Sequence, residues 1–143
     1  MEGIKAHIHK VLDTLDITRP GDYEKIEYLK AMELAADGIS ALGHRYAAEA
    51  RKLAEAEPDE KRRKELLQIA ETCDQVPEKP ARTFREAIQS MYIYQTCIFM
   101  EQNAASYNPG RMDQYLYPFY KADIKADRLT EEEAAGTFGL LMG

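Results

Sequence analysis

The sequence predicts an all-α fold, a helical bundle with one long helix and one largely buried helix, forming a single domain over residues 1–143. Three observations carry this prediction. Apolar residues recur at spacings of three and four along most of the chain, which is the period of an α-helix. No segment shows a convincing strand pattern. The 143 residues, 45% of them hydrophobic and only 6 of them proline, are enough for one domain and not comfortably for two.

The first half of the chain predicts a short helix followed by a long one. The short helix covers residues 3–15, where apolar side chains form a single stripe. A Pro-Gly break follows, and Asp22 is placed to cap the next helix. Apolar residues then recur over 26–53 with a period close to 3.5, which predicts one long helix. Within it, Gly38 and Gly43 are expected to mark points where a neighbouring backbone approaches closely.

The middle of the chain contains two further helix starts. Pro58 fits the first turn of a helix, and two prolines make residues 76–82 an extended linker. Thr83 and Glu86 then have the spacing of a capping box, with the helix beginning at Phe84. That helix is apolar around nearly its whole circumference, which predicts burial on all sides. A chain of this length achieves such burial with difficulty, so the pattern indicates a part of something larger.

The last third predicts a loop over 104–110 and a helix over 111–126, rich in tyrosine and phenylalanine. A second capping box, Thr130 with Glu133, begins the last helix. Glycines at 136, 139 and 143 end that helix abruptly, as expected of a truncated chain.

Composition and charge exclude several classes of function. The formal net charge of -6 gives no electrostatic reason to expect a nucleic-acid partner. No apolar stretch has the length of a membrane span, and no signal peptide is present. Two cysteines, Cys73 and Cys97, are too few for a disulfide scaffold, which indicates a reducing cytoplasm. The spacing of His7, His9 and His44 does not suit a metal site.

Polar and aromatic side chains are dense over residues 101–120. A buried helix that ends in polar amides and a Gly-Arg turn can line a pocket. The residue types alone favour a structural interpretation: Arg111 and Asp113 anchor the loop through charge-assisted hydrogen bonds, and Asn103 caps the preceding helix. No residue of the chain is assigned a catalytic role.

Several short segments, taken in chain order, match the pattern of a known family. They are Pro-Ala-Arg-Thr-Phe at 80–84, Gly-Arg-Met-Asp-Gln-Tyr at 110–115, Tyr-Lys-Ala-Asp at 120–123 and Leu-Thr-Glu-Glu-Glu-Ala at 129–134. From about Tyr23 onward the chain resembles the glycyl radical enzymes. This family includes pyruvate formate-lyase (formate acetyltransferase), the diol dehydratases, choline trimethylamine-lyase and isethionate sulfite-lyase. The Gly-Arg-x-Asp-Gln-Tyr run is typical of the dehydratase-like branch.

The resemblance implies an enzyme several times longer than this chain, with helices packed around a ten-stranded α/β barrel. Its anaerobic radical chemistry cleaves a C–C, C–O, C–N or C–S bond of a small polar substrate. That chemistry uses a Gly-Cys-x-Glu loop and an Arg-Val-x-Gly-Tyr motif, neither of which is present here. The chain is therefore expected to be an N-proximal section that is inactive alone. The parent enzyme would carry a glycyl radical installed by a radical-SAM activating enzyme.

The resemblance also assigns substrate contacts. The family stretch that reaches the substrate corresponds to Asn103, Ala105 and Ser106, and Tyr107 would shape the pocket wall. Ser106 keeps the hydroxyl that would bond a substrate oxygen. Ala105 stands where the diol dehydratases have histidine, which disfavours glycerol and propanediol. Choline and isethionate both remain open as substrates.

A different class of function is compatible with the same residues. The apolar helix that begins at Phe84 could bind a partner chain or a second copy of itself, without catalysis. Large exposed apolar surfaces drive association. Both interpretations predict a homo-oligomer for the isolated chain.

Overall fold

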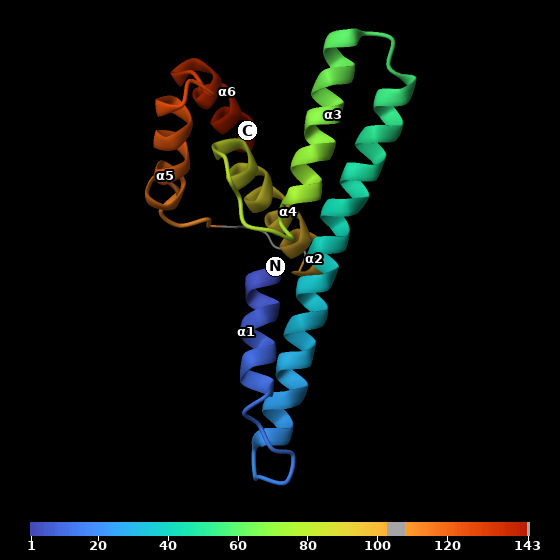
Figure 1. The fold of residues 1–143 in the computed structure, drawn as a ribbon, viewed down its shortest axis with the longest axis vertical. Coiled ribbons are helices and arrows are strands. Elements are labelled where there is room, and N and C mark those ends of the chain that lie inside the picture. Colours follow the sequence, from blue (N-terminus) through green and yellow to red (C-terminus); the bar gives the residue numbers. More distant parts are fainter. Residues whose placement is uncertain (103–107, 143) are drawn as a thin grey trace.

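The computed structural model describes residues 1–102 and 108–142, and only the backbone at 138 and 140–142. Over these residues it consists of helices and contains no strand (Figure 1). The all-α prediction is thereby confirmed for the described residues. The helices are α1 (Glu2–Leu12), α2 (Asp22–Ala56), α3 (Glu60–Gln75), α4 (Phe84–Gln102), α5 (Met112–Lys125) and α6 (Glu131–Met142).

The long helix α2 is the axis of the molecule. In Figure 1, α1 lies beside its N-terminal half and α3 beside its C-terminal half, while α4, α5 and α6 gather to one side. The inner ends of α1 and α3 meet, because the Met1 ammonium donates to the carbonyl oxygens of Pro77 at 2.5 Å and Glu78 at 2.6 Å. The prediction of one long helix is confirmed.

Small side chains let α3 approach α2 closely. Ala47, Ala50 and Ala54 are buried on the face of α2 that meets α3. A Cβ built on Gly43 would lie 2.8 Å from Cδ of Pro77, so this position requires glycine. A Cβ built on Gly38 would meet no described atom within 4 Å beyond its chain neighbours and the backbone of its own helix. The prediction of close approach is therefore confirmed at Gly43 and wrong at Gly38.

Two predicted helix starts are wrong in detail. Asp22 begins α2 and does not cap it; its carboxylate accepts from the backbone N–H of Asp16 at 3.2 Å and from Lys25 at 2.9 Å. Pro58 precedes α3 and does not form its first turn. Asp59 caps α3, because its carboxylate can accept from the Lys61 backbone N–H, at 2.9 Å.

The two predicted capping boxes differ. At α6 the box is complete, since the Thr130 backbone N–H donates to the Glu133 carboxylate at 2.9 Å and the Glu133 N–H donates back to the Thr130 hydroxyl at 3.2 Å. At α4 only half forms: the Glu86 N–H donates to the Thr83 hydroxyl at 3.2 Å. The Glu86 carboxylate instead accepts from the backbone N–H of Arg82 at 2.6 Å and from its guanidinium group.

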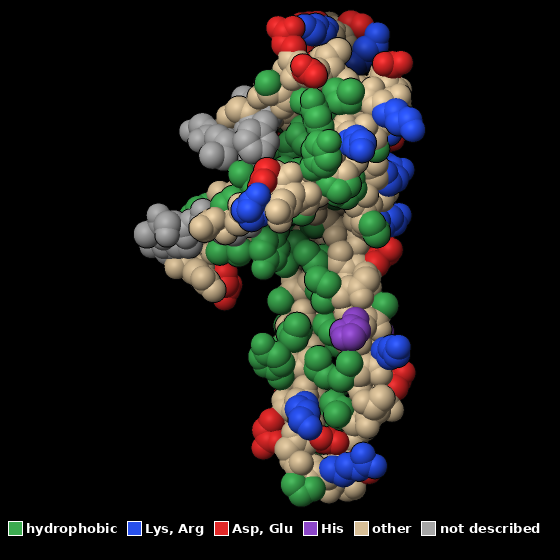
Figure 2. All heavy atoms as spheres, turned by 90° about the vertical axis from the view of Figure 1, so that its left-hand side faces the viewer, with side chains coloured by type: hydrophobic (Ala, Val, Ile, Leu, Met, Phe, Trp, Pro, Cys, Tyr) green, Lys and Arg blue, Asp and Glu red, His purple; other side chains and the backbone are tan. Residues whose placement is uncertain are grey.

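Helix α4 is buried over its first half only. Phe84, Ala87 and Ile88 pack with α5 and α6, and Ile93 packs between α2 and α3. Toward the C-terminal end, by contrast, the side chains of Tyr94 and Met100 are 43% and 65% exposed. The prediction of burial on all sides is thus wrong within this chain, because the neighbouring described helices cover only part of α4. Figure 2 shows hydrophobic side chains gathered over the middle of the molecule.

No helix in the described part of the chain has the length and apolar content needed to cross a membrane.

Candidate functional site

The four predicted substrate contacts, Asn103, Ala105, Ser106 and Tyr107, lie outside the described residues. The structure describes what adjoins them on both sides. Helix α4 ends at Gln102, and a turn over residues 108–111 leads into α5. The candidate site is therefore built from this turn and from the side chains that hold it.

The turn owes its shape to two residues. The Asn108 side-chain oxygen accepts from the Gly110 backbone N–H at 2.9 Å, an Asx turn. Gly110 has φ +72°, in the left-handed region that glycine adopts without steric penalty. The Met112 N–H then donates to the Gly110 carbonyl at 3.0 Å as α5 begins. The Asn-Pro-Gly sequence therefore fixes the direction in which the chain enters α5.

Arg111 and Asp113 bond to each other at the start of α5. The guanidinium donates to both carboxylate oxygens, at 2.9 and 2.7 Å, and both side chains are exposed. The Arg111 guanidinium holds the pKa of Asp113 below its usual value, and the carboxylate raises the pKa of Arg111. Asp113 also lies in the first turn of α5, where a negative charge suits the helix dipole. The pair braces the start of one helix.

Tyr115 connects three parts of the site, and no sequence pattern distinguishes it from the neighbouring tyrosines. Its hydroxyl lies 2.9 Å from the Pro109 carbonyl oxygen and 2.9 Å from the sulfur of Met91 on α4. The only available signal was its position one helical turn after Arg111. This tyrosine therefore joins the turn to α4.

A second tie joins the start of α4 to the C-terminal part of α5. The buried carboxylate of Asp123 accepts from the backbone N–H of Phe84, the first residue of α4, at 2.8 Å. Arg128 donates to the same carboxylate at 2.7 Å, and the ring of Tyr120 meets that of Phe84 edge-on. The free N–H groups at a helix start need acceptors, and here a distant helix supplies one. Sequence patterns carry no signal for such a non-local cap.

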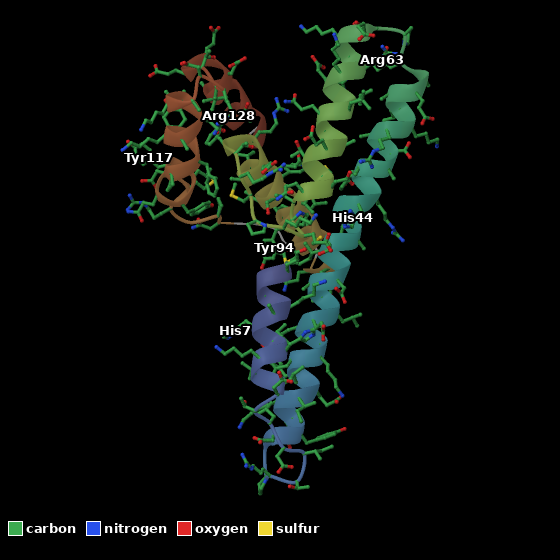
Figure 3. All side chains as sticks on the ribbon, viewed as in Figure 1. His7, His44, Arg63, Tyr94, Tyr117 and Arg128 are labelled. Carbon is green, nitrogen blue, oxygen red and sulfur yellow. The ribbon has the colours of Figure 1, made fainter. Side chains whose placement is uncertain are left out.

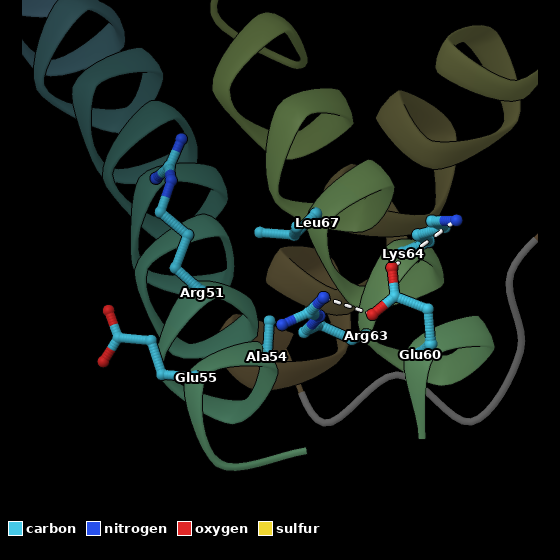
Figure 4. Close-up of a pocket in the computed structure, with 7 residues that line it drawn as sticks. All are labelled: Arg51, Ala54, Glu55, Glu60, Arg63, Lys64 and Leu67. Atoms are coloured by element: carbon cyan, nitrogen blue, oxygen red, sulfur yellow. Dashed lines mark hydrogen bonds and ion pairs between the residues drawn. The ribbon is translucent and has the colours of Figure 1, made fainter. Parts of the chain in front are cut away.

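Two of the grooves between the described helices bring no catalytic set of side chains together. One lies between α2 and α4 beside the end of α4, with a mainly apolar lining that includes Leu34, Ile39 and Cys97. Another, shown in Figure 4, lies between the C-terminal end of α2 and the start of α3. Three of its charged side chains form ion pairs within the groove, because Arg63 and Lys64 both pair with Glu60.

The remaining candidate groups do not converge on a site. Burial, together with the Asp74 charge, raises the pKa of the Cys73 thiol, and burial raises the pKa of Cys97. Both cysteines are therefore thiols near neutral pH and weak nucleophiles. Figure 3 shows His7 on α1 and His44 on α2, in separate parts of the molecule. Among the described residues, no three metal-ligating side chains gather.

Known proteins are similar to this chain in sequence and in fold. The model of the "Pyruvate formate lyase-like" family matches residues 1–142. The chain is 42% identical over 133 residues to isethionate sulfite-lyase of Bilophila wadsworthia, covering 92% of this chain and 16% of that protein. It is 41% identical over 133 residues to trans-4-hydroxy-L-proline dehydratase of Clostridioides difficile, covering 92% of this chain and 17% of that protein.

Solved structures of similar proteins superpose closely on this chain. A structure concerned with 1,2-propanediol dehydration in Roseburia inulinivorans superposes with a TM-score of 0.92 at 37% identity, over 95% of this chain and 16% of the other. A glycyl radical enzyme from Archaeoglobus fulgidus superposes with a TM-score of 0.86 at 34% identity, over 94% and 17% of the two chains. The chain thus spans about a sixth of the length of these proteins.

Proposed function

Because the chain belongs to the pyruvate formate lyase-like family, we propose that it serves as the substrate-contacting helical section of a glycyl radical lyase. The observation that carries this proposal is the match of residues 1–142 to the family. Relatives that are 41–42% identical over 133 residues include a sulfite-lyase and a dehydratase, and this section makes up 16–17% of each. The bond-breaking step belongs to the whole enzyme and not to these residues alone.

The proposed substrate is a small molecule that carries a hydroxyl group. Isethionate, 1,2-propanediol and trans-4-hydroxy-L-proline, which the names of similar proteins contain, all share this group. The reaction would cleave the C–S bond beside the hydroxyl-bearing carbon or the C–O bond of a hydroxyl group. A glycyl radical, installed by a radical-SAM activating enzyme on residues outside this chain, would start it by hydrogen-atom transfer.

Ser106 and Asn103 are proposed to hydrogen-bond that substrate, with Ala105 and Tyr107 shaping the pocket wall. Support comes from their place between the end of α4 and the braced turn at 108–111. Substrate contacts gain precision when rigid elements hold both ends of the segment that bears them. Arg111 and Asp113 are proposed to fix the loop and to take no part in the chemistry.

A chimera tests this proposal. This chain would replace the matched section of the Bilophila isethionate sulfite-lyase, and sulfite release from isethionate would be measured after activation. We expect the chimera to turn over isethionate, and Ser106→Ala to raise KM with the glycyl radical content unchanged. Ser90→Ala, on the first half of α4, is the matched control. A chimera that forms the radical normally but shows no change of KM with Ser106→Ala would overturn the assignment.

A second candidate function is self-association, either within a homo-oligomeric enzyme or as an interaction module without catalysis. The observation that favours it is the apolar surface of α4, where Tyr94 and Met100 are exposed. The apolar groove between α2 and α4 extends that surface.

The proposed location of the protein is the reducing cytoplasm. Both cysteines are free, which fits this location.

A further inference from the structure

The groove between α2 and α4 exposes large apolar side chains that the described part of the chain leaves uncovered. Leu34 of α2 is 74% exposed, and Tyr94 and Met100 of α4 are 43% and 65% exposed. Between the two helices the groove has a volume of about 600 Å³ and opens to solvent. Exposed apolar patches of this kind mark surfaces that bind another element.

Other faces of α2 already have partners within the chain. Helix α1 pairs with Glu33 and Asp37 of α2, and the linker after α3 packs against Gly43. At Gly38, which lines the groove, a built Cβ would meet no described atom within 4 Å beyond its chain neighbours and the backbone of its own helix. The face of α2 that lines the groove is therefore open at Gly38.

We propose that this groove docks an apolar segment of the parent enzyme, from the part that lies outside residues 1–143. The inference rests on the proposed function in one respect, that the chain is a section of a larger enzyme. The chain covers 16% of the Bilophila isethionate sulfite-lyase and 16% of the solved chain on which it superposes with a TM-score of 0.92, so about five sixths of such a protein can supply the segment. A segment of the same polypeptide reaches the groove at an effective concentration on the order of 1 mM, far above that of a second copy at micromolar concentration.

The lining of the groove selects an apolar occupant. Among the described residues that line it, only Glu101 carries a charge, and it lies beside Gln102 at the C-terminal end of α4. A small polar ligand would need several polar groups that converge on it. An apolar helix face or loop needs none, and it would bury its side chains against Leu34 and Met100.

Thiol labelling shows whether the groove is covered in the whole enzyme. Cys97 lines the groove and is partly exposed in this chain, whereas Cys73 is 2% exposed. The isethionate sulfite-lyase chimera, without activation, would be labelled with iodoacetamide, and the rate at each cysteine measured by peptide mass spectrometry. We expect Cys97 to react as slowly as Cys73. Ala48→Cys, at an exposed position of α2 outside the groove, is the control and should react at least about tenfold faster.

Three outcomes of this labelling would overturn the proposal. Cys97 that reacts as fast as the thiol of Ala48→Cys would show an uncovered groove. Slow reaction at both positions would show burial of the whole section and not docking at this groove. Protection of Cys97 that disappears when the chimera is diluted to a monomer would make a second copy the occupant.

A charge in the groove should expel the docked segment. Leu34→Glu places a carboxylate where the segment would bury it, and an unpaired buried charge is costly. We expect this variant of the chimera to label at Cys97 at least about tenfold faster. Leu53→Glu makes the same change at a 51% exposed side chain of α2 outside the groove and should leave the rate unchanged. An unchanged rate with Leu34→Glu, or an equal increase with Leu53→Glu, would contradict docking at Leu34.

This test is separate from the test of the substrate contacts, because labelling needs neither the radical nor the substrate. If Cys97 is protected but KM does not respond to Ser106→Ala, the docking holds and the proposed substrate contacts fail. If Cys97 is unprotected while Ser106→Ala raises KM, the substrate contacts hold and the docking is wrong.

Discussion

The Asp123 carboxylate accepts a 2.8 Å hydrogen bond from the backbone N–H of Phe84, across 39 residues of chain. Both groups are buried. One carboxylate thus completes the start of α4 and fixes α5 against it, and Arg128 neutralises the charge from the exposed side at 2.7 Å. The Tyr115 hydroxyl, near the start of α5, contacts Met91 on α4. The two helices are therefore joined by side-chain contacts at two places.

Removing this carboxylate should destabilise the protein strongly. We expect Asp123→Ala to lower the free energy of unfolding by about 2–3 kcal/mol, because it leaves the Phe84 N–H buried without its acceptor. Asp123→Asn keeps an acceptor oxygen and should recover about half of that loss. Urea denaturation measures both. Asp37→Ala removes an exposed partner of Lys5 and should change stability by no more than about 0.5 kcal/mol; an equal loss in Asp37→Ala and Asp123→Ala would contradict the assignment.

The two glycines of α2 should respond oppositely to alanine. Alanine is more favourable than glycine inside a helix by up to about 1 kcal/mol. Gly38→Ala should raise the free energy of unfolding by up to that amount, since the new Cβ would meet no described atom within 4 Å beyond its chain neighbours and its own helix backbone. Gly43→Ala should instead lose about 1–3 kcal/mol by overpacking. Its new methyl would lie 2.8 Å from Cδ of Pro77 and 3.2 Å from two carbonyl oxygens. Thermal unfolding of the two variants in parallel decides the matter, and a stabilised Gly43→Ala would refute this packing.

The Glu86 carboxylate should make stability depend on pH. Burial acts to raise the pKa of Glu86, but the hydrogen bonds from Arg82 outweigh it and leave the pKa below its usual value of 4.5. A carboxylate with a lowered folded-state pKa stabilises the fold above its unfolded pKa, and that contribution is lost as pH falls through the folded value. Glu86→Gln should therefore be less stable by about 1–2 kcal/mol at pH 7. The difference in free energy of unfolding between the wild type and Glu86→Gln should decrease between about pH 5 and pH 3. A difference that stays constant over this range would count against the ion pair.

Local patterns predicted the helices well because they depend on neighbours in sequence. The period of apolar residues located the long helix, and the spacing of Thr130 and Glu133 located the start of α6. Where one side chain could accept from two different donors, the pattern failed. Glu86 bonds to Arg82 in place of completing its box with Thr83, because the guanidinium adds a charge-assisted bond.

Non-local contacts had no signal in the sequence. Asp123 meets Phe84 only because of how α5 folds back, and Gly38 and Gly43 look alike until Pro77 is placed beside one of them. The burial of α4 was overestimated for a related reason. The described helices of this chain cover only the first half of α4, and the chain spans only about a sixth of isethionate sulfite-lyase.

The last prediction concerns that uncovered half. We expect this chain alone to form a dimer or larger oligomer at micromolar concentration, measured by light scattering, because exposed apolar patches of this kind drive association. Met100→Glu places a charge at a side chain that is 65% exposed on α4 and should shift the chain toward the monomer. Ile17→Glu makes the same change at a 67% exposed side chain between α1 and α2, outside this surface, and should leave association unchanged. A wild-type chain that stays monomeric at high concentration would exclude self-association through this surface. Association that responds equally to both variants would place the contact elsewhere.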